Sequence, residues 1–90
     1  MNAHNKSVRA PNPAALRGAR RWLLRDAIGE YGYLLESHGR SISEAAFQSN
    51  DSLIRIHLRS NRIVLKAAID AFRELAALDK AAEAEGVKVD

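Results

Sequence analysis

The most regular pattern of apolar and polar residues runs from Asp51 to about Leu78. Its basic residues recur at intervals of three, four and seven, which places them within roughly 60° of one another on a helix. This basic stripe consists of Arg55, Arg59, Arg62, Lys66 and Arg73. The opposite side carries Leu53, His57, Val64, Ala68, Ala71, Leu75 and Leu78, with Ile56 and Ile63 on one flank and Ile69 and Phe72 on the other. We expect a long helix over residues 52–79 that is buried on most sides.

The first half of the chain predicts another helix, over residues 13–37. Asn12 can cap a helix, and Pro13 suits the first helical position, where no N–H is needed. The apolar face of this helix is expected to contain Leu16, Leu23, Ala27, Tyr31, Leu34 and Leu35, widened by Trp22, Leu24 and Ile28. Gly29 weakens the helix and favours a kink, and Gly39 is a typical C-cap.

A short helix is predicted between these two, over residues 42–48, because Ser41 and Glu44 have the spacing of a capping box. Ser49, Asn50 and Asp51 then offer a polar turn and a cap for the long helix. The predicted fold class is therefore all-α, with three main helices (13–37, 42–48 and 52–79) in a helix-turn-helix-like arrangement.

Ninety residues indicate one domain, and so short a chain has a thin margin of stability that dimerisation or a partner would improve. We expect a disordered basic arm over residues 1–12, a single helical domain over 13–80 and an acidic tail over 81–90. The chain has no cysteine, no run of about 18 apolar residues and no secretory signal pattern. A cytoplasmic protein is the expectation.

Charge is distributed unevenly along the chain. Residues 1–25 contain six basic side chains and no acidic one, whereas residues 74–90 contain five acids and two lysines. Arg17, Arg20 and Arg21 form a secondary basic patch in the first of these segments. This order permits contact with nucleic acid or pairing with an acidic partner.

Catalytic and metal-binding patterns are missing from the sequence. His4, His38 and His57 are too widely spaced for two of them to act as metal ligands on one helix face. The sequence contains no glycine-rich phosphate loop, nucleophile elbow or paired catalytic carboxylates. We expect a protein that is not an enzyme and uses no cofactor.

Three short motifs carry a resemblance to a known family. They are G-R-S-I-S-E-A-A-F at 39–47, D-S-L at 51–53 and A-F-R-E-L at 71–75. Over residues 16–76 the chain resembles the helix-turn-helix-variant domain of proteobacterial regulators of conjugative-element transfer. The long members of that family are transcriptional activators, and stand-alone copies are small antiactivators.

The resemblance implies that this single domain is an antiactivator, which binds a transcriptional activator and blocks its action in the control of mobile-element transfer or quorum sensing. The candidate binding residues are the basic stripe together with Ile56 and Ile63. One alternative is a direct DNA-binding helix-turn-helix regulator that uses the stripe and the secondary basic patch. Another is a structural helical dimer. A protein partner is expected, DNA is possible, no membrane is involved, and the chain is a monomer or a homodimer.

Overall fold

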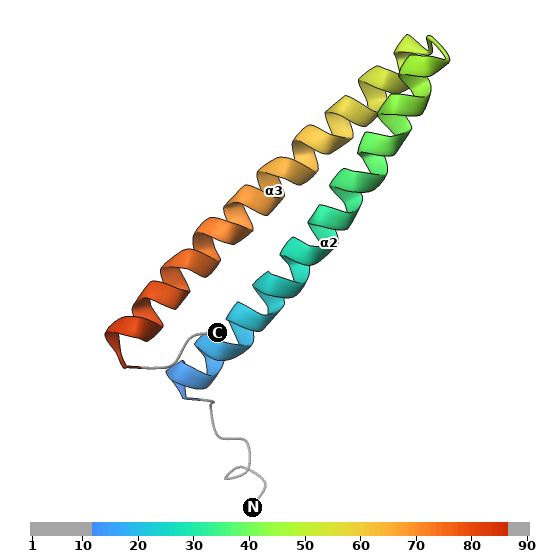
Figure 1. The fold of residues 1–90 in the computed structure, drawn as a ribbon. Coiled ribbons are helices and arrows are strands. Elements are labelled where there is room, and N and C mark those ends of the chain that lie inside the picture. The colour runs from blue at the N-terminus through green and yellow to red at the C-terminus, as the bar shows by residue number, and fades with distance from the viewer. Residues whose placement is uncertain (1–11, 87–90) are drawn as a thin grey trace, which may run out of the picture.

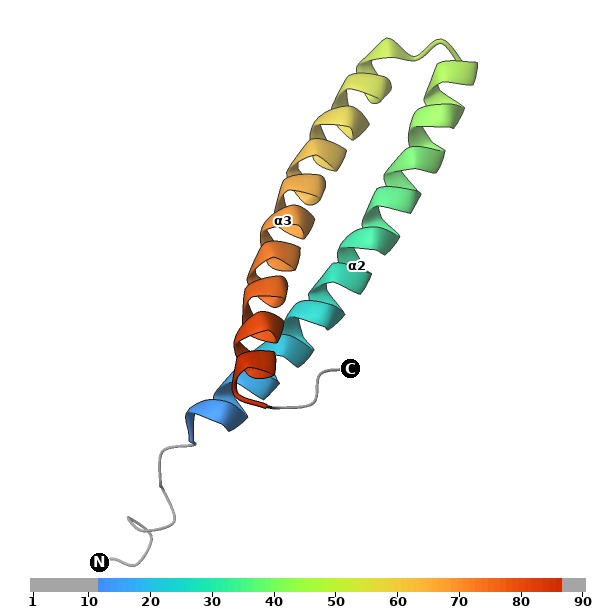
Figure 2. The same ribbon diagram turned by 60° about the vertical axis from the view of Figure 1, so that its left-hand side comes forward.

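The computed structural model describes residues 12–86, which form two long antiparallel helices (Figure 1). Helix α2 spans Pro13–Phe47 and helix α3 spans Asp51–Ala84. Each is about 50 Å long at 1.5 Å per residue. The two lie side by side as a hairpin, so that the beginning of α2 is next to the end of α3 (Figures 1 and 2). The all-α prediction is confirmed.

The predicted three-helix, helix-turn-helix-like arrangement is wrong. Residues 13–37 and 42–48 belong to one helix, α2, which continues through Gly29 and Gly39 without a break. Gly39 does not adopt the left-handed conformation of a C-cap, since Gly86 is the only glycine with positive φ in the described part of the chain. The apolar spacing continues past Gly39 to Ile42 and Ala45. Packing of that segment against α3 outweighs the cost of about 1 kcal/mol for a helical glycine.

Helix α2 begins at the predicted residue, and α3 begins at Asp51, one residue before the predicted start. The Oδ1 atom of Asn12 accepts a hydrogen bond of 2.8 Å from the N–H of Ala15, and Pro13 is the first helical residue. The Oδ1 atom of Asn50 accepts one of 3.2 Å from the N–H of Leu53. Helix α3 continues to Ala84, so the segment expected to be an acidic tail begins as helix, while the predicted arm lies almost wholly outside the described residues.

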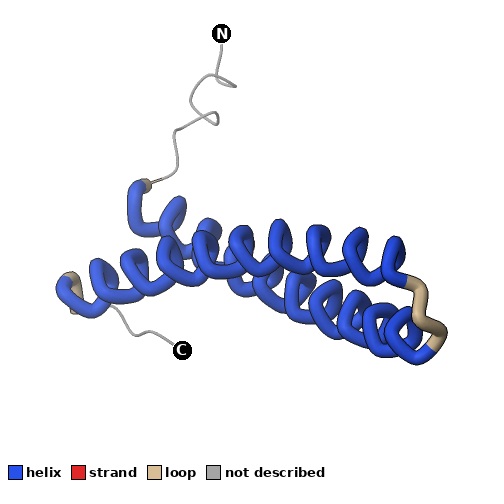
Figure 3. The backbone as a smooth tube through the Cα atoms, turned by 90° about the horizontal axis from the view of Figure 1, so that it is seen from above, coloured by secondary structure: helices blue, strands red, loops and turns tan. Residues whose placement is uncertain are grey.

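The turn between the helices is three residues long, Gln48 to Asn50, and appears as a short loop in Figure 3. The N–H of Asn50 donates to the carbonyl of Ala45 at 2.8 Å, and that of Ser49 donates to the carbonyl of Ala46 at 3.1 Å. These two bonds form a Schellman motif, which usually has glycine at its left-handed position. Here Ser49 occupies that position with a φ of 56°. The left-handed residue of this turn is therefore a serine, in a segment that contains no glycine.

The helices meet along a seam whose residues alternate at intervals of three and four. This spacing is typical of a coiled coil, because it keeps one stripe of each helix facing the other. The seam of α2 contains Arg17, Arg21, Leu24, Ile28, Tyr31, Leu35, His38, Ile42 and Ala45. The seam of α3 contains Ile54, His57, Asn61, Val64, Ala68, Ala71, Leu75, Leu78 and Ala82.

The core of this hairpin is small. Leu24, Ala71 and Leu75 form its buried cluster, with Ile28, Tyr31 and Leu78 packed against it. The expectation that α3 is buried on most sides is wrong, because only the side facing α2 is covered. Thirteen large apolar side chains of the described residues are exposed, whereas two large ones, Leu24 and Leu75, are buried. A two-helix hairpin has too little interior to cover the apolar residues that this sequence carries.

A polar layer interrupts the seam toward the turn. The Nδ1 atoms of His38 and His57 lie 3.0 Å apart, so one imidazole donates a hydrogen bond and the other accepts it. The Oδ1 atom of Asn61, one turn further along α3, is buried without a hydrogen-bond partner. Polar residues in a coiled-coil seam reduce stability and specify the register of the helices.

Candidate functional site

Two ion pairs identify the two flanks of the hairpin, one on each side of the seam. Arg20 pairs with Glu74 on one flank, and Arg25 pairs with Asp79 on the other. At 100° per residue, further side chains can be assigned to the flank of Arg20 and Glu74. We call this side the pocket flank, because a hollow described below lies on it. It carries Leu16, Leu23, Ala27 and Leu34 from α2, and Ile56, Ile63 and Ala67 from α3.

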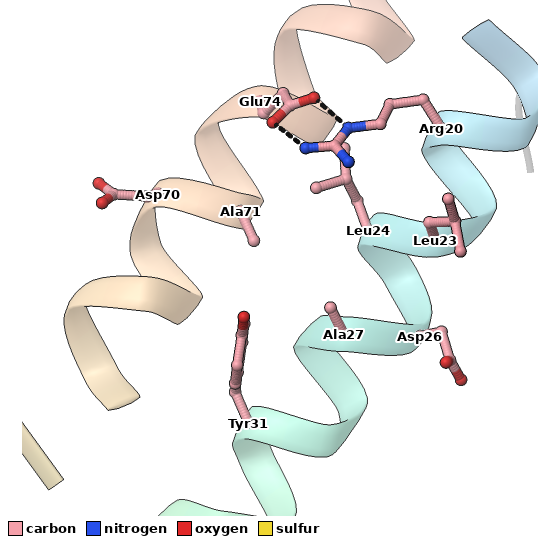
Figure 4. Close-up of a pocket in the computed structure, with 9 residues that line it drawn as sticks. All are labelled: Arg20, Leu23, Leu24, Asp26, Ala27, Tyr31, Asp70, Ala71 and Glu74. Atoms are coloured by element: carbon pink, nitrogen blue, oxygen red, sulfur yellow. Dashed lines mark hydrogen bonds and ion pairs between the residues drawn. The ribbon is translucent and has the colours of Figure 1, made fainter. Parts of the chain in front are cut away.

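A hollow of about 550 Å³ lies on the pocket flank between the two helices (Figure 4). The alanines Ala27 and Ala71 line it from opposite helices, and the Tyr31 ring reaches into the space between the helices. Small side chains on both helices leave room that larger residues would fill. The complete lining consists of Arg20, Leu23, Leu24, Asp26, Ala27, Tyr31, Asp70, Ala71 and Glu74.

Charged groups surround this apolar floor. The guanidinium of Arg20 makes two bonds to the Glu74 carboxylate, of 2.5 Å from Nε and 2.9 Å from Nη2 (Figure 4). Hydrogen bonds from Arg20 lower the pKa of the Glu74 carboxyl, and the same bonds raise the pKa of Arg20. Asp26 and Asp70 add two carboxylates to the lining. The carboxylate of Asp70 is engaged by Lys66 at 2.9 Å, and that of Glu74 by Arg20. The hollow therefore suits an apolar side chain.

Further exposed apolar side chains lie along the same flank. They come from both helices and are Leu16, Leu23, Leu34, Ile56 and Ile63. Ile63 and Ile56, which the sequence placed beside the basic stripe, are 65% and 56% exposed. A row of exposed apolar side chains on one side of a protein typically marks an interaction site.

The basic stripe lies on the face of α3 that points away from α2, and all five of its residues are exposed. Lys66 pairs with Asp70 at 2.9 Å. Among residues 12–86, the four arginines of the stripe have no ion-pair partner. The stripe runs for about 27 Å along the helix, from Arg55 to Arg73. The structure thus brings the predicted basic residues into one line.

The secondary basic patch is engaged in contacts within the chain. Arg17 pairs with Glu85, Arg20 with Glu74, and Arg21 with Asp79. These contacts explain the uneven charge of the sequence, because the basic beginning of α2 lies beside the acidic end of α3. The acidic partner of the patch is the chain itself.

Sequence reasoning missed the hollow and the exposure of part of α2. Leu16, Leu23 and Leu34 were expected in the core, but the seam instead runs through Leu24 and Ile28. The signal was present in the alternation of three and four through Leu24, Ile28, Tyr31 and Leu35. It was masked because the leucines at 16, 23 and 34 share a helical period of their own.

Several other findings bear on function. Within the described residues, no group of three metal-binding side chains comes together, and neither helix has a stretch that is apolar enough to cross a membrane. No protein-family model, no curated protein and no solved structure matches the chain.

Proposed function

We propose that this chain is a small regulatory protein that acts by binding another protein through its pocket flank. The observation that carries this proposal is the hollow between Ala27 and Ala71, on a flank that also carries exposed leucines and isoleucines, in a hairpin with a very small core. Large apolar side chains that insert into such hollows supply much of the free energy of protein association.

The residues that line the hollow indicate the kind of partner that would bind there. An apolar floor formed by Leu24, Ala27 and Ala71 favours an amphipathic helix that inserts a leucine or an aromatic residue. Such a helix would lie along the hairpin beside α2 and α3. The narrower assignment of the partner as a transcriptional activator follows from the sequence resemblance alone.

This role needs no recognition helix. The continuous α2 replaces the short helix and turn of a helix-turn-helix, so a groove-reading mode of that kind has no basis in this fold. The unpaired arginines of the basic stripe favour a second candidate, electrostatic contact with nucleic acid along the outer face of α3. The two functions use different surfaces and respond differently to salt.

The test is affinity capture from cells of the source organism, with two matched variants. Ile63 on the pocket flank and Tyr33 on the outer face of α2 are 65% and 66% exposed, so I63E and Y33E each introduce a carboxylate at a position of nearly the same fractional exposure. We expect a protein that is retained by the wild type and Y33E and reduced at least tenfold with I63E. Retention by all three forms alike would contradict the proposal.

A fluorescence anisotropy titration with a mixed-sequence duplex tests the second candidate. Binding at low salt that collapses at physiological salt and weakens in R59A would indicate phosphate contacts. We expect little binding to the duplex at physiological salt and no effect of R59A on capture of the protein partner.

A further inference from the structure

The flank opposite the hollow carries a second row of exposed apolar residues. On the side of the Arg25–Asp79 pair, α3 presents large side chains at intervals of seven, four and three. They are Leu58, Leu65, Ile69 and Phe72, and Trp22 joins them from α2. On the same side α2 presents Gly29, Gly32 and Gly39, where an added Cβ would meet nothing within 4 Å. We name this surface the glycine flank.

The apolar area of the glycine flank is large enough for a stable interface. Its five large side chains are between 42% and 75% exposed. At roughly 200 Å² for a large side chain, they expose about 550 Å² in one copy, and a pair of such surfaces would bury about 1,100 Å² of apolar area. The surrounding backbone and charged groups bring the total into the range of about 1,200–2,000 Å² that specific interfaces bury.

We propose that the glycine flank binds a second copy of this chain and forms an antiparallel four-helix bundle. The two hairpins are related by a two-fold axis along their length, so that α3 of each copy lies on α2 of the other. The row of large side chains on one copy then meets the glycines of its partner, and the reverse contact forms at the same time. Two hairpins packed in this way have antiparallel neighbours throughout, as in up-down bundles.

The register of the hairpin places the complementary groups at matching heights. Contacts between Arg20 and Glu74 and between His38 and His57 show that α2 and α3 run level with each other over this length. Leu65 is therefore level with Gly32, to within one helical turn. A two-fold axis along the hairpin keeps these heights, so Leu65 of one copy meets Gly32 of the other.

Leu58 and Gly39 form an equivalent pair one heptad toward the turn. Leu58 is 52% exposed, and Gly39 has open space where its side chain would be. The other two-fold arrangement, with α3 against α3, would set large side chains against large ones and glycines against glycines. Only the axis along the hairpin fills the space over the glycines with apolar side chains.

Charge supports the same arrangement. Arg62 borders the large row of α3 and has no ion-pair partner in the described part of its own chain. Glu36 borders the glycine row of α2 at about the same height, and its carboxylate is exposed while it contacts Arg40 at 3.2 Å. In the dimer Arg62 of one copy lies near Glu36 of the other, which fixes the register of two otherwise apolar surfaces.

This inference is independent of the proposed function, because it uses the opposite side of the hairpin. The dimer leaves the hollow on the pocket flank open, together with Arg59, Lys66 and Arg73 on the outer face. One dimer would therefore present two copies of the partner-binding surface, one on each outer side.

Sedimentation equilibrium of the full chain tests the proposal. A mass of twice 9.9 kDa is expected for the wild type at micromolar concentration. The decisive variant is G32L, because each hairpin has open space at this position and leucine favours helix over glycine. We expect G32L to keep its helical circular dichroism but to weaken dimerisation at least tenfold, while I63E on the pocket flank remains dimeric.

Two results would overturn the inference. One is a wild type that stays at 9.9 kDa up to high concentration. The other is a dimer that I63E dissociates and G32L does not, which would assign self-association to the pocket flank. The charge contact has its own control, since R62E should weaken the dimer and the double variant R62E/E36R should restore it.

Discussion

The two halves of the hairpin share one seam but differ in what fills it. The open half, residues 13–31 with 68–84, contains Leu24, Leu75 and the cluster around them, and ion pairs join its two helices. The turn half, residues 35–47 with 51–64, contains the contact of His38 with His57 and the buried Oδ1 atom of Asn61, which lacks a hydrogen-bond partner. Within the described residues no ion pair joins the helices there.

The comparison shows that the spacing that aligns the two helices is a separate property from the burial that stabilises them. Heptad spacing is equally regular in both halves and is enough to keep the helices together along their length. Burial of leucine side chains in the open half raises the free energy of unfolding, whereas polar groups in the seam of the turn half lower it. We infer that the open half is the more stable one, although the turn half is closed by the loop.

The largest expected effect comes from breaking the packing of the open half. Leu24 is 5% exposed, and L24A removes its contacts with Ala71 and Leu75. The loss should be about 2–4 kcal/mol in the free energy of unfolding, measured by urea denaturation at fixed protein concentration. The control is L34A, at a position that is 42% exposed, where the loss should stay below about 1 kcal/mol. Equal losses would contradict the assigned seam.

An intermediate effect of opposite sign is expected in the turn half. N61L removes a buried oxygen that lacks a hydrogen-bond partner and adds an apolar side chain to the seam. The free energy of unfolding should rise by about 1–2 kcal/mol. R59L, on the exposed outer face, makes a polar position apolar without touching the seam and should change stability by less than about 0.5 kcal/mol. A loss of stability in N61L would contradict this prediction.

The smallest effect concerns the ion pair of the open half and depends on pH. Arg20 lowers the pKa of Glu74 in the folded state below its unfolded value of about 4.3. The pair therefore stabilises the fold above that pH, and this contribution is lost as the pH falls through the folded pKa. E74Q should be less stable than the wild type at pH 7 and equal to it at low pH, by urea unfolding at both values. E83Q, at an exposed carboxylate without an ion pair, should show no such difference.

Local signals in the sequence predicted the starts of the two helices well, but they predicted the C-terminal ends and the number of helices poorly. Asn12 and Asn50 cap the two helices because a short polar side chain meets free N–H groups wherever a helix begins. Gly39 and the Ser41–Glu44 pair have equally good end signals, yet they lie inside α2. Their effect is about 1 kcal/mol, and the packing of the segment that follows on α3 exceeds it.

Of the candidate surfaces, the sequence predicted the basic stripe but not the hollow, because only the stripe depends on a local pattern. The basic stripe follows from the helical period alone, so its alignment along α3 could be read from spacing. The hollow between Ala27 and Ala71 needs the register of two helices that are distant in sequence, and no local pattern contains it. Exposure of Leu23 and Ile63 likewise depends on which of several apolar stripes the other helix covers.

The sequence by itself determined that this chain is helical, where both helices begin, and that α3 has a basic side and an apolar side. These properties depend on propensity, capping and periodicity, which act within a few residues. Only the tertiary structure decided that α2 is continuous, which stripe becomes the seam and which apolar residues remain outside. Those choices depend on packing between residues that are far apart in the chain, where the gain from burying one stripe exceeds the preferences of single residues.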